Sequence, residues 1–200
     1  MVTAAQIEKQ ITGELAHLFS EQGFSVTSPR LVEKIRDNGV AWQLRCGARK
    51  DPMSKKILIG LSAGLRFASV EAFLEREQEP RAPTLSVPMH LLHEDHVFVE
   101  WDAAESGTWS SLEEEVRRYA LPFFEHFERL ENVLEALESE DPQNSLPVSR
   151  NERIELMAGV LAVLGRPSDA LAWVNRGLEA LKNRPPGHRR KLEQLYAKLK

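Results

Sequence analysis

The chain has 200 residues, 42% of them hydrophobic and 28% charged, with a net charge of −4. This composition is typical of a globular protein with a packed core and excludes a disordered chain. A single cysteine, Cys46, cannot form an internal disulfide, and no apolar run approaches the ~20 residues that span a bilayer, so we expect no membrane partner. The N-terminus lacks the basic and apolar stretches of a signal peptide, so the expected location is the cytoplasm.

The first predicted element is an amphipathic helix over residues 3–22, where apolar side chains recur at spacings of three and four. Thr3 and Gln6 match a capping box, in which each residue's side chain bonds the other's backbone N–H. Gly23 is a natural end for this helix.

A β region follows the helix. Segments 31–36 and 40–46 flank an Asn-Gly pair at 38–39, which is the strongest short-range signal for a hairpin. A longer strand is predicted over residues 56–67, and Ser69 is expected to cap a short helix after it. Two more strands, 85–92 and 96–101, are expected, and Pro88 should place the first of them at a sheet edge.

A long helical region is predicted from Ser110, with competing capping boxes that begin at Ser110 and Ser111. Pro122 is expected to break or restart the helix. An apolar seam follows at spacings of 4, 3, 4 and 3; it consists of Phe123, Phe127, Leu130, Leu134 and Leu137. Carboxylates repeat one residue after the seam and define an acidic ridge: Glu128, Glu131, Glu135 and Glu138.

Residues 141–147 form the best linker, because they contain two prolines and separate segments of opposite charge. Residues 102–141 carry a net charge of −9, whereas residues 142–200 carry +6. The second segment is predicted to hold a helical hairpin, 154–164 and 168–181, with Ser168 as a cap, and then a basic terminal helix. We therefore predict an α+β domain over 1–141, with an antiparallel sheet of about five strands and helices on one face, followed by a helical extension over 142–200.

Ser62 lies in Gly60-Leu61-Ser62-Ala63-Gly64, which matches the G-x-S-x-G nucleophile elbow of serine hydrolases. That fold needs several strands before the elbow, and here one helix and one hairpin use the 59 preceding residues. The alternative is a strand of small residues against which a helix packs closely, and we prefer this interpretation.

Three histidines, His90, His93 and His96, lie within seven residues and could bind a transition metal. In a strand, His93 points away from the other two, and in a helix His96 does. Because a tetrahedral site wants more ligands than two imidazoles, we expect a solvated turn and predict no metal, no cofactor and no catalytic residue.

The acidic ridge could contact a basic partner, although most charged runs are solvated helix faces. Trp101 and Trp109 are added as candidate partner-binding residues, because exposed tryptophans mark interfaces, whereas the alternative for both is a place in the core. The basic tail could contact nucleic acid but is expected instead to fold back on the ridge; its cations are Arg184, Arg189, Arg190, Lys191, Lys198 and Lys200.

Several of these features together resemble the bacterial family called domain of unknown function 4304. The resemblance covers residues of about 5–140 and is carried by Gly23-Phe24, the hairpin at 38–39, the strand at 57–61 and the segment Leu121-Pro122-Phe123-Phe124. It implies the α+β fold and supplies no catalytic residues. Separately, the turn near Leu164-Gly165-Arg166 is similar to that of a single tetratricopeptide-type hairpin.

The leading hypothesis is thus a non-enzymatic interaction protein of the bacterial cytoplasm, for example an immunity-type protein that neutralises a toxin. One alternative is a small hydrolase that uses Ser62 or a metal at the histidines. Another is nucleic-acid binding through the basic tail, which would weaken steeply with salt. The oligomeric state is left open.

Overall fold

The computed structural model describes the whole chain except residues 1, 76–81, 140, 142–145, 183–186 and 188. Strands are β1 (Ser25–Ser28), β2 (Leu31–Ile35), β3 (Val40–Lys50), β4 (Ile57–Phe67), β5 (Leu85–Pro88) and β6 (Trp101–Asp102). Helices are α1 (Ala4–Leu18), α2 (Ala68–Leu74), α3 (Thr108–Glu115), α4 (Leu121–Phe127), α5 (Leu130–Glu138), α6 (Arg150–Val163), α7 (Pro167–Ala180) and α8 (Arg190–Leu199). The chain is an α+β protein with a helical C-terminal region, as predicted.

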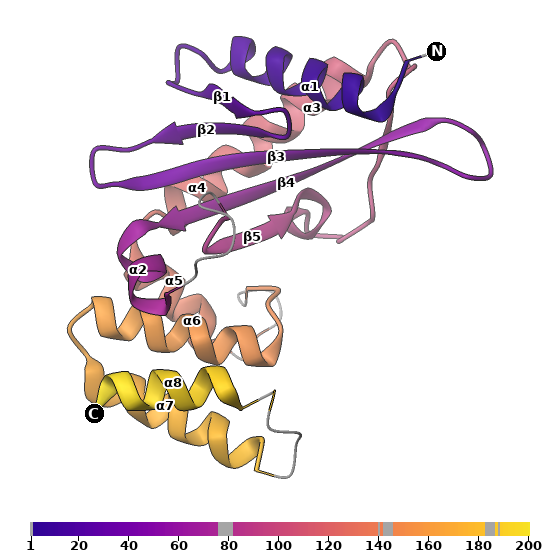
Figure 1. The fold of residues 1–200 in the computed structure, drawn as a ribbon. Helices are drawn as coiled ribbons and strands as arrows, with labels where there is room; N and C mark the ends of the chain where they lie inside the picture. Colours follow the sequence, from indigo (N-terminus) through magenta and orange to yellow (C-terminus); the bar gives the residue numbers. More distant parts are fainter. Residues whose placement is uncertain (1, 76–81, 140, 142–145, 183–186, 188) are drawn as a thin grey trace. The chain divides into compact units, whose positions relative to one another are not determined.

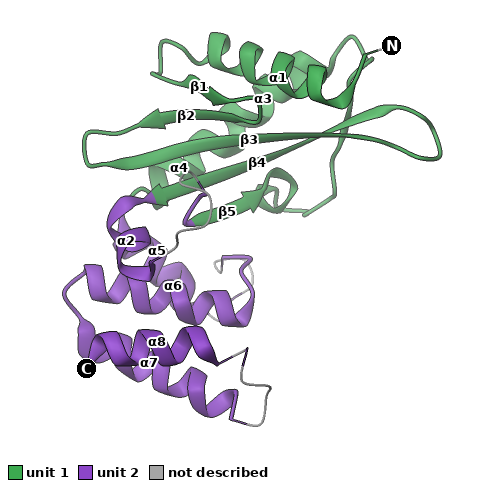
Figure 2. Cartoon of the chain, in the orientation of Figure 1, with its two compact units in different colours: residues 1–66, 85–128 green, residues 67–84, 129–200 purple. Residues whose placement is uncertain are grey.

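The described residues divide into two compact units (Figure 2). Unit 1 comprises residues 1–66 and 85–128, and unit 2 comprises residues 67–84 and 129–200. The predicted division at residue 141 therefore differs from the observed one. The physical reason is that α2, which comes much earlier in the sequence than α6, packs against α6 inside unit 2.

Unit 1 is built on one sheet with the strand order β1-β2-β3-β4-β5. The short strand β6 lies outside this order and pairs with β4. The predicted hairpin joins β2 and β3, with Ile35 opposite Ala41. Its turn needs a left-handed residue: Gly39 has a φ of +78°, and its N–H donates to the carbonyl of Arg36 at 2.9 Å. A glycine adopts this conformation without a steric penalty. The hairpin predicted from the Asn-Gly pair is therefore confirmed.

Both faces of the sheet are covered at β2 and β3, because residues 31–33 and 40–44 are buried without alternation. Alternate residues of β4, from Ile59 to Phe67, are buried, and the residues between them are mostly only half-buried. Helices α3 and α4 lie behind the strands in Figure 1, whereas α1 lies beside β1 and contacts β1, β2 and β3. Trp42 of β3 stacks on Phe124 of α4 at 5.3 Å between ring centroids, and Phe24 contacts both rings.

The predicted strand 85–92 ends early, at Pro88, because proline has no N–H with which to continue the ladder. Residues 89–92 form the 3-10 helix η1 instead. The strand predicted over 96–101 is also wrong except at its last residue, since only Trp101 and Asp102 pair with β4. Between η1 and β6 the chain has no regular structure, and Val97 and Phe98 are 56% and 64% exposed.

The helical region of unit 1 starts at Thr108, earlier than predicted, and neither Ser110 nor Ser111 caps it. A π-helical turn, η2 (Val116–Ala120), precedes Pro122, and the N–H of Leu121 donates to the carbonyl of Val116. The wider turn places Pro122 in the first turn of a new α-helix, where its missing N–H is not needed. Pro122 therefore restarts the helix, which was one of the two predicted outcomes.

Unit 2 consists of α2 and α5–α8. The capping box of α1 is present as predicted, but in unit 2 neither predicted cap forms, because α2 starts at Ala68 and α7 starts at Pro167. Glycines let two helix pairs approach closely: a Cβ at Gly159 would lie 3.0 Å from Val70, and one at Gly177 would lie 2.8 Å from Leu192. None of the helices in the described ranges has the length and apolar run needed to span a bilayer.

Candidate functional site

The acidic ridge is not continuous. Helix α4 ends at Phe127 and α5 begins at Leu130, and between them Arg129 has an extended backbone with a ψ of 127°. Glu128 thus belongs to unit 1, where its carboxylate accepts a hydrogen bond from Arg36 Nε at 3.2 Å. The other three carboxylates share α5 and are exposed. We call these three the acidic face of α5: Glu131, Glu135 and Glu138.

The basic tail makes contacts that were not predicted. Lys191 Nζ donates to the carbonyl of Leu74 at 2.6 Å. Lys198 Nζ pairs with Glu75 at 2.6 Å and donates to the carbonyl of Phe73. These described cations meet the end of α2, because a helix C-terminus presents free carbonyls and a partial negative charge. The expectation that the tail folds back on the ridge is wrong for these two lysines, and Arg184 lies outside the described residues.

The two candidate tryptophans differ in their surroundings. Trp101 is 9% exposed and pairs with Ile59 in the sheet, so it belongs to the core. Trp109 is half-buried in the first turn of α3. A third tryptophan, Trp42, is buried beneath two cations, with Lys34 Nζ 4.6 Å from its ring centroid. Burial, followed by the charge of Arg36, lowers the pKa of Lys34 from its ordinary value.

The three histidines do not converge. His90 contacts Phe98 edge-on at 4.9 Å between ring centroids. His93 pairs through Nε2 with the Glu115 carboxylate at 2.7 Å and stacks on Tyr119. His96 is exposed, with a φ of +51°. Among the described residues, no group of three or more His, Cys, Asp or Glu side chains is placed to hold a metal ion.

Ser62 lies inside β4, opposite Pro88 of β5. A nucleophile elbow is a sharp turn between a strand and a helix, whereas Gly60 to Gly64 here are part of one continuous strand. The alternative interpretation, a strand on which a helix packs closely, is wrong at Gly60, because a Cβ there would meet no described atom within 4 Å. The small residues instead leave this surface of the sheet open, and it forms the floor of a groove.

The groove has a volume of about 480 Å³ and is assembled entirely from unit 1. Its floor is Gly47 of β3 with Gly60 and Ser62 of β4. A Cβ at Gly47 or Gly60 would have no neighbour within 4 Å among the described atoms, so both glycines open onto free space. The walls come from the turn before β2, the end of β5, η1 and the segment before β6; they include Arg30, Pro88, His90, Phe98 and Glu100.

Ion pairs hold the charged walls of the groove. Arg30 Nε donates to the buried Glu8 carboxylate at 2.7 Å, and the other oxygen of Glu8 accepts the N–H of Ala48 at 3.0 Å. In the segment before β6, Glu100 accepts hydrogen bonds on both oxygens from Arg49, at 3.0 and 2.5 Å. Glu100 is 16% exposed, and Arg30 is 67% exposed. Both groups are ion-paired, but the Glu100 carboxylate is bonded on both oxygens, whereas Arg30 bonds through Nε and is largely exposed to solvent.

Ser62 and His90, candidates in two separate hypotheses from the sequence, both line this groove, whereas Arg30, Gly47, Phe98 and Glu100 were not predicted. These residues come from three separate segments, and no local pattern links them. Phe98 was assigned to a strand that does not form, which concealed its exposure. The open glycines could have been noticed, because glycine is rare inside strands unless something approaches the backbone closely.

Cys46 lies beside the groove with its side chain buried. Burial, with a smaller contribution from the nearby Glu8 carboxylate, raises the pKa of its thiol to about 12. Since the thiolate is the nucleophile, we expect Ellman's reagent to react slowly with the native protein at pH 8 and rapidly after unfolding in guanidinium. Rapid labelling of the native state would contradict this.

The same shift gives a pH dependence of stability. The unfolded thiol ionises near pH 9 and the folded one near 12, so the unfolded state loses its proton first. Stability from this group is therefore complete below pH 9 and is lost as the pH rises towards 12. We expect a Cys46→Ala variant to lose this component of the decline, measured by denaturant unfolding between pH 8 and 11.

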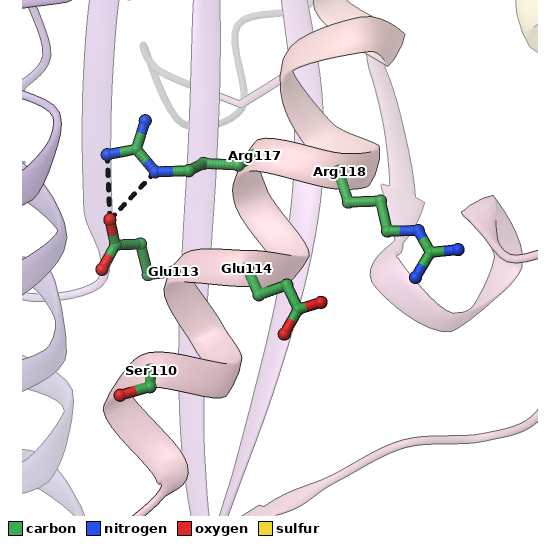
Figure 3. A pocket seen from close by; sticks show the side chains of 5 residues that line it. All are labelled: Ser110, Glu113, Glu114, Arg117 and Arg118. Carbon is green, nitrogen blue, oxygen red and sulfur yellow. Dashed lines mark hydrogen bonds and ion pairs between the residues drawn. The ribbon is translucent and has the colours of Figure 1, made fainter.

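A second, shallower hollow of about 380 Å³ lies on the surface of α3 and η2 (Figure 3). It is lined by Ser110, Glu113, Glu114, Arg117 and Arg118. Arg117 pairs with Glu113 one turn away at 2.9 Å, and Arg118 points away from that pair. All these side chains come from one helical stretch, so the hollow lacks the enclosing walls that a ligand site needs.

Comparison of the chain with family models, with curated proteins and with solved structures gave no match. The resemblance to domain of unknown function 4304 thus stays a prediction. Within the described part of the chain, the groove of unit 1 is a candidate site whose walls come from several separate segments.

Proposed function

We propose that the protein is a non-enzymatic binding protein of the cytoplasm, and that the groove of unit 1 is its ligand site. The observation that carries this proposal is the open floor at Gly47 and Gly60, walled by side chains from separate segments. Its volume is in the range of small-molecule pockets, about 300–1,000 Å³. Held ion pairs keep the walls in place without a ligand, which lowers the cost of binding.

Binding is favoured over catalysis by how the polar groups are arranged. A serine hydrolase needs a histidine that contacts the nucleophile and is oriented by an acid. In the groove, both oxygens of Glu100 accept hydrogen bonds from Arg49, and the described contact of His90 is with the Phe98 ring. A fluorophosphonate probe tests the alternative, and stoichiometric labelling of Ser62 would overturn the non-enzymatic assignment.

The groove can be filled without disturbing the fold. We expect Gly60→Leu to fold with unchanged or slightly higher stability, because the new side chain meets open space and strands favour larger residues. The matched control is Gly13→Leu, which also meets open space but lies on the exposed side of α1. Binding should be compared by dialysis against a cell extract, followed by mass spectrometry of retained small molecules.

The expected result is that wild type and Gly13→Leu enrich the same compounds and Gly60→Leu does not. If Gly60→Leu retains every compound that the wild type retains, the groove is not the ligand site. Circular dichroism of the three proteins establishes that any loss is not a loss of fold.

A second candidate, supported by the acidic face of α5, is an immunity-type protein that neutralises a basic toxin. The three carboxylates are exposed on one helix whose opposite side, including Leu134 and Leu137, is buried. Complementary charge accelerates and orients association. Glu128 is left out of this surface because it belongs to unit 1, where Arg36 pairs with it at 3.2 Å. Glu131 is kept, since its pair with Arg129 is longer, at 3.8 Å, and both side chains are exposed.

Charge reversal tests the acidic face. With Glu131, Glu135 and Glu138 changed to Lys, we expect association with a basic partner to slow by at least tenfold at low salt and the difference to shrink at high salt. Glu179→Lys, on the exposed side of α7, is the control. Partner capture from the native host, followed by stopped-flow association rates, gives the measurement; equal rates for both variants would remove this role.

A further inference from the structure

We infer that the groove takes a ligand in which an oxyanion is joined to a flat apolar group. This inference rests on the proposed function and specifies its ligand. It depends on three features of the groove: open hydrogen-bond donors, a neutralised carboxylate, and a bare floor beside an exposed aromatic ring.

The donors come from three segments. Arg30 contacts Glu8 through Nε, and its terminal nitrogens have no hydrogen bond among the described contacts, although its side chain is 67% exposed. The Ser62 hydroxyl and the His90 imidazole also line the groove without a described hydrogen-bond partner. A guanidinium whose two terminal NH2 groups are open suits a carboxylate, sulfonate or phosphate, because the planar fork matches two oxygens.

The groove does not repel an anion. Its wall carboxylate, Glu100, is bound by Arg49 in two parallel hydrogen bonds, which cancels the charge and occupies the lone pairs that face the arginine. The Glu8 carboxylate is 4% exposed and is likewise occupied on both oxygens. Both acids therefore hold arginines in position and do not compete for the ligand.

The floor and the aromatic wall suit a flat group. Gly47 and Gly60 lie on two neighbouring strands, and neither has an atom within 4 Å of the place of a Cβ, so a planar ring can approach the backbone there. Phe98 is 64% exposed and lines the same groove, and the edge of His90 supports its ring. An exposed phenylalanine is costly in water, and covering it with an aromatic group recovers apolar burial and ring stacking.

Three small probes separate these requirements. 2-Naphthoate carries both the ring and the anion, 2-naphthamide keeps the ring without the charge, and acetate has the anion alone. Binding is followed in two-dimensional NMR spectra of the full chain through the amide shifts of Gly47, Gly60 and Ser62. We expect the dissociation constant obtained from these shifts to be at least tenfold lower for 2-naphthoate than for 2-naphthamide. Acetate should bind weakly.

Two variants locate the effect. Arg30→Lys keeps a cation for Glu8 but loses the planar fork, so 2-naphthoate should bind several-fold more weakly while 2-naphthamide is unchanged. Gly60→Leu should abolish binding of both ring compounds, and Gly13→Leu should not. Equal affinity for the acid and the amide in the wild type, with both lost in Gly60→Leu, would overturn the anion requirement and leave the groove as a site. Absence of any shift at the groove amides with all three probes would overturn the inference itself, whereas the extract experiment decides the proposed function separately.

Discussion

Phe124→Ala is expected to destabilise the protein by about 3–5 kcal/mol, the usual cost of deleting a fully buried aromatic side chain. Phe124 is 0% exposed, and its ring stacks on Trp42 and contacts Phe24 and Phe123. The loss combines the transfer of the ring to water with a cavity that its neighbours cannot close. The ring joins α4 to the sheet, so its loss should lower the stability of the variant. The urea concentration at the midpoint of unfolding should therefore be lower than for the wild type.

The control for this change is Phe98→Ala, which deletes the same atoms from a side chain that is 64% exposed. It should alter the free energy of unfolding by less than about 0.5 kcal/mol, as surface substitutions usually do. It should nevertheless weaken binding of 2-naphthoate. Similar losses of stability in the two variants would show that Phe124 is not part of a tightly packed core.

Arg153→Ala is expected to destabilise unit 2 by about 2–4 kcal/mol, because each hydrogen bond to a charged group contributes roughly 1.5–3 kcal/mol and these bonds are not additive. Arg153 Nη1 donates to the carbonyls of Leu137 at 2.7 Å and Ser139 at 3.3 Å, and Nη2 donates to that of Leu146 at 3.2 Å. One guanidinium thus holds the C-terminal end of α5 and the buried Leu146 against α6. Hydrogen exchange at the amides of α5 should accelerate.

Arg150→Ala provides the comparison, since Arg150 is exposed in the first turn of the same helix. A cation at a helix N-terminus opposes the helix dipole, so removing it should be neutral or slightly stabilising. If both arginine variants lose the same stability, the three carbonyl contacts of Arg153 contribute nothing specific.

The local features of the fold could be predicted from the sequence. The capping box at Thr3 and the hairpin at Asn38-Gly39 depend on residues only a few positions apart, and both form as expected. The strand over 57–67 was also correct, because its small and apolar residues have no competing helical pattern. The prediction that the acidic ridge is one continuous surface was wrong. The regular spacing of its carboxylates did not indicate that Arg129 has an extended backbone and separates α4 from α5.

The features that failed depend on contacts between distant segments. Nothing near α2 shows that it packs against α6, about 80 residues later. The groove has the same origin, because Ser62, His90 and Arg30 become neighbours only when the sheet and the segment before β6 are in place. The π-helical turn before Pro122 was also hidden, since an added residue in a helix leaves little trace in an apolar periodicity.

The placement of α2 in unit 2 has a consequence for synthesis on the ribosome. At about 5–20 residues per second, α2 emerges roughly 4–20 seconds before its partner α6. During that interval Val70 and Leu74, which are fully buried in the finished protein, have no partner helix. The strands β1 to β4 can already pair in this period, so the nascent chain holds a growing sheet that ends in an exposed apolar helix. We therefore expect the window between α2 and α6 to be the stage at which a chaperone that binds apolar segments has most effect on the yield of folded protein.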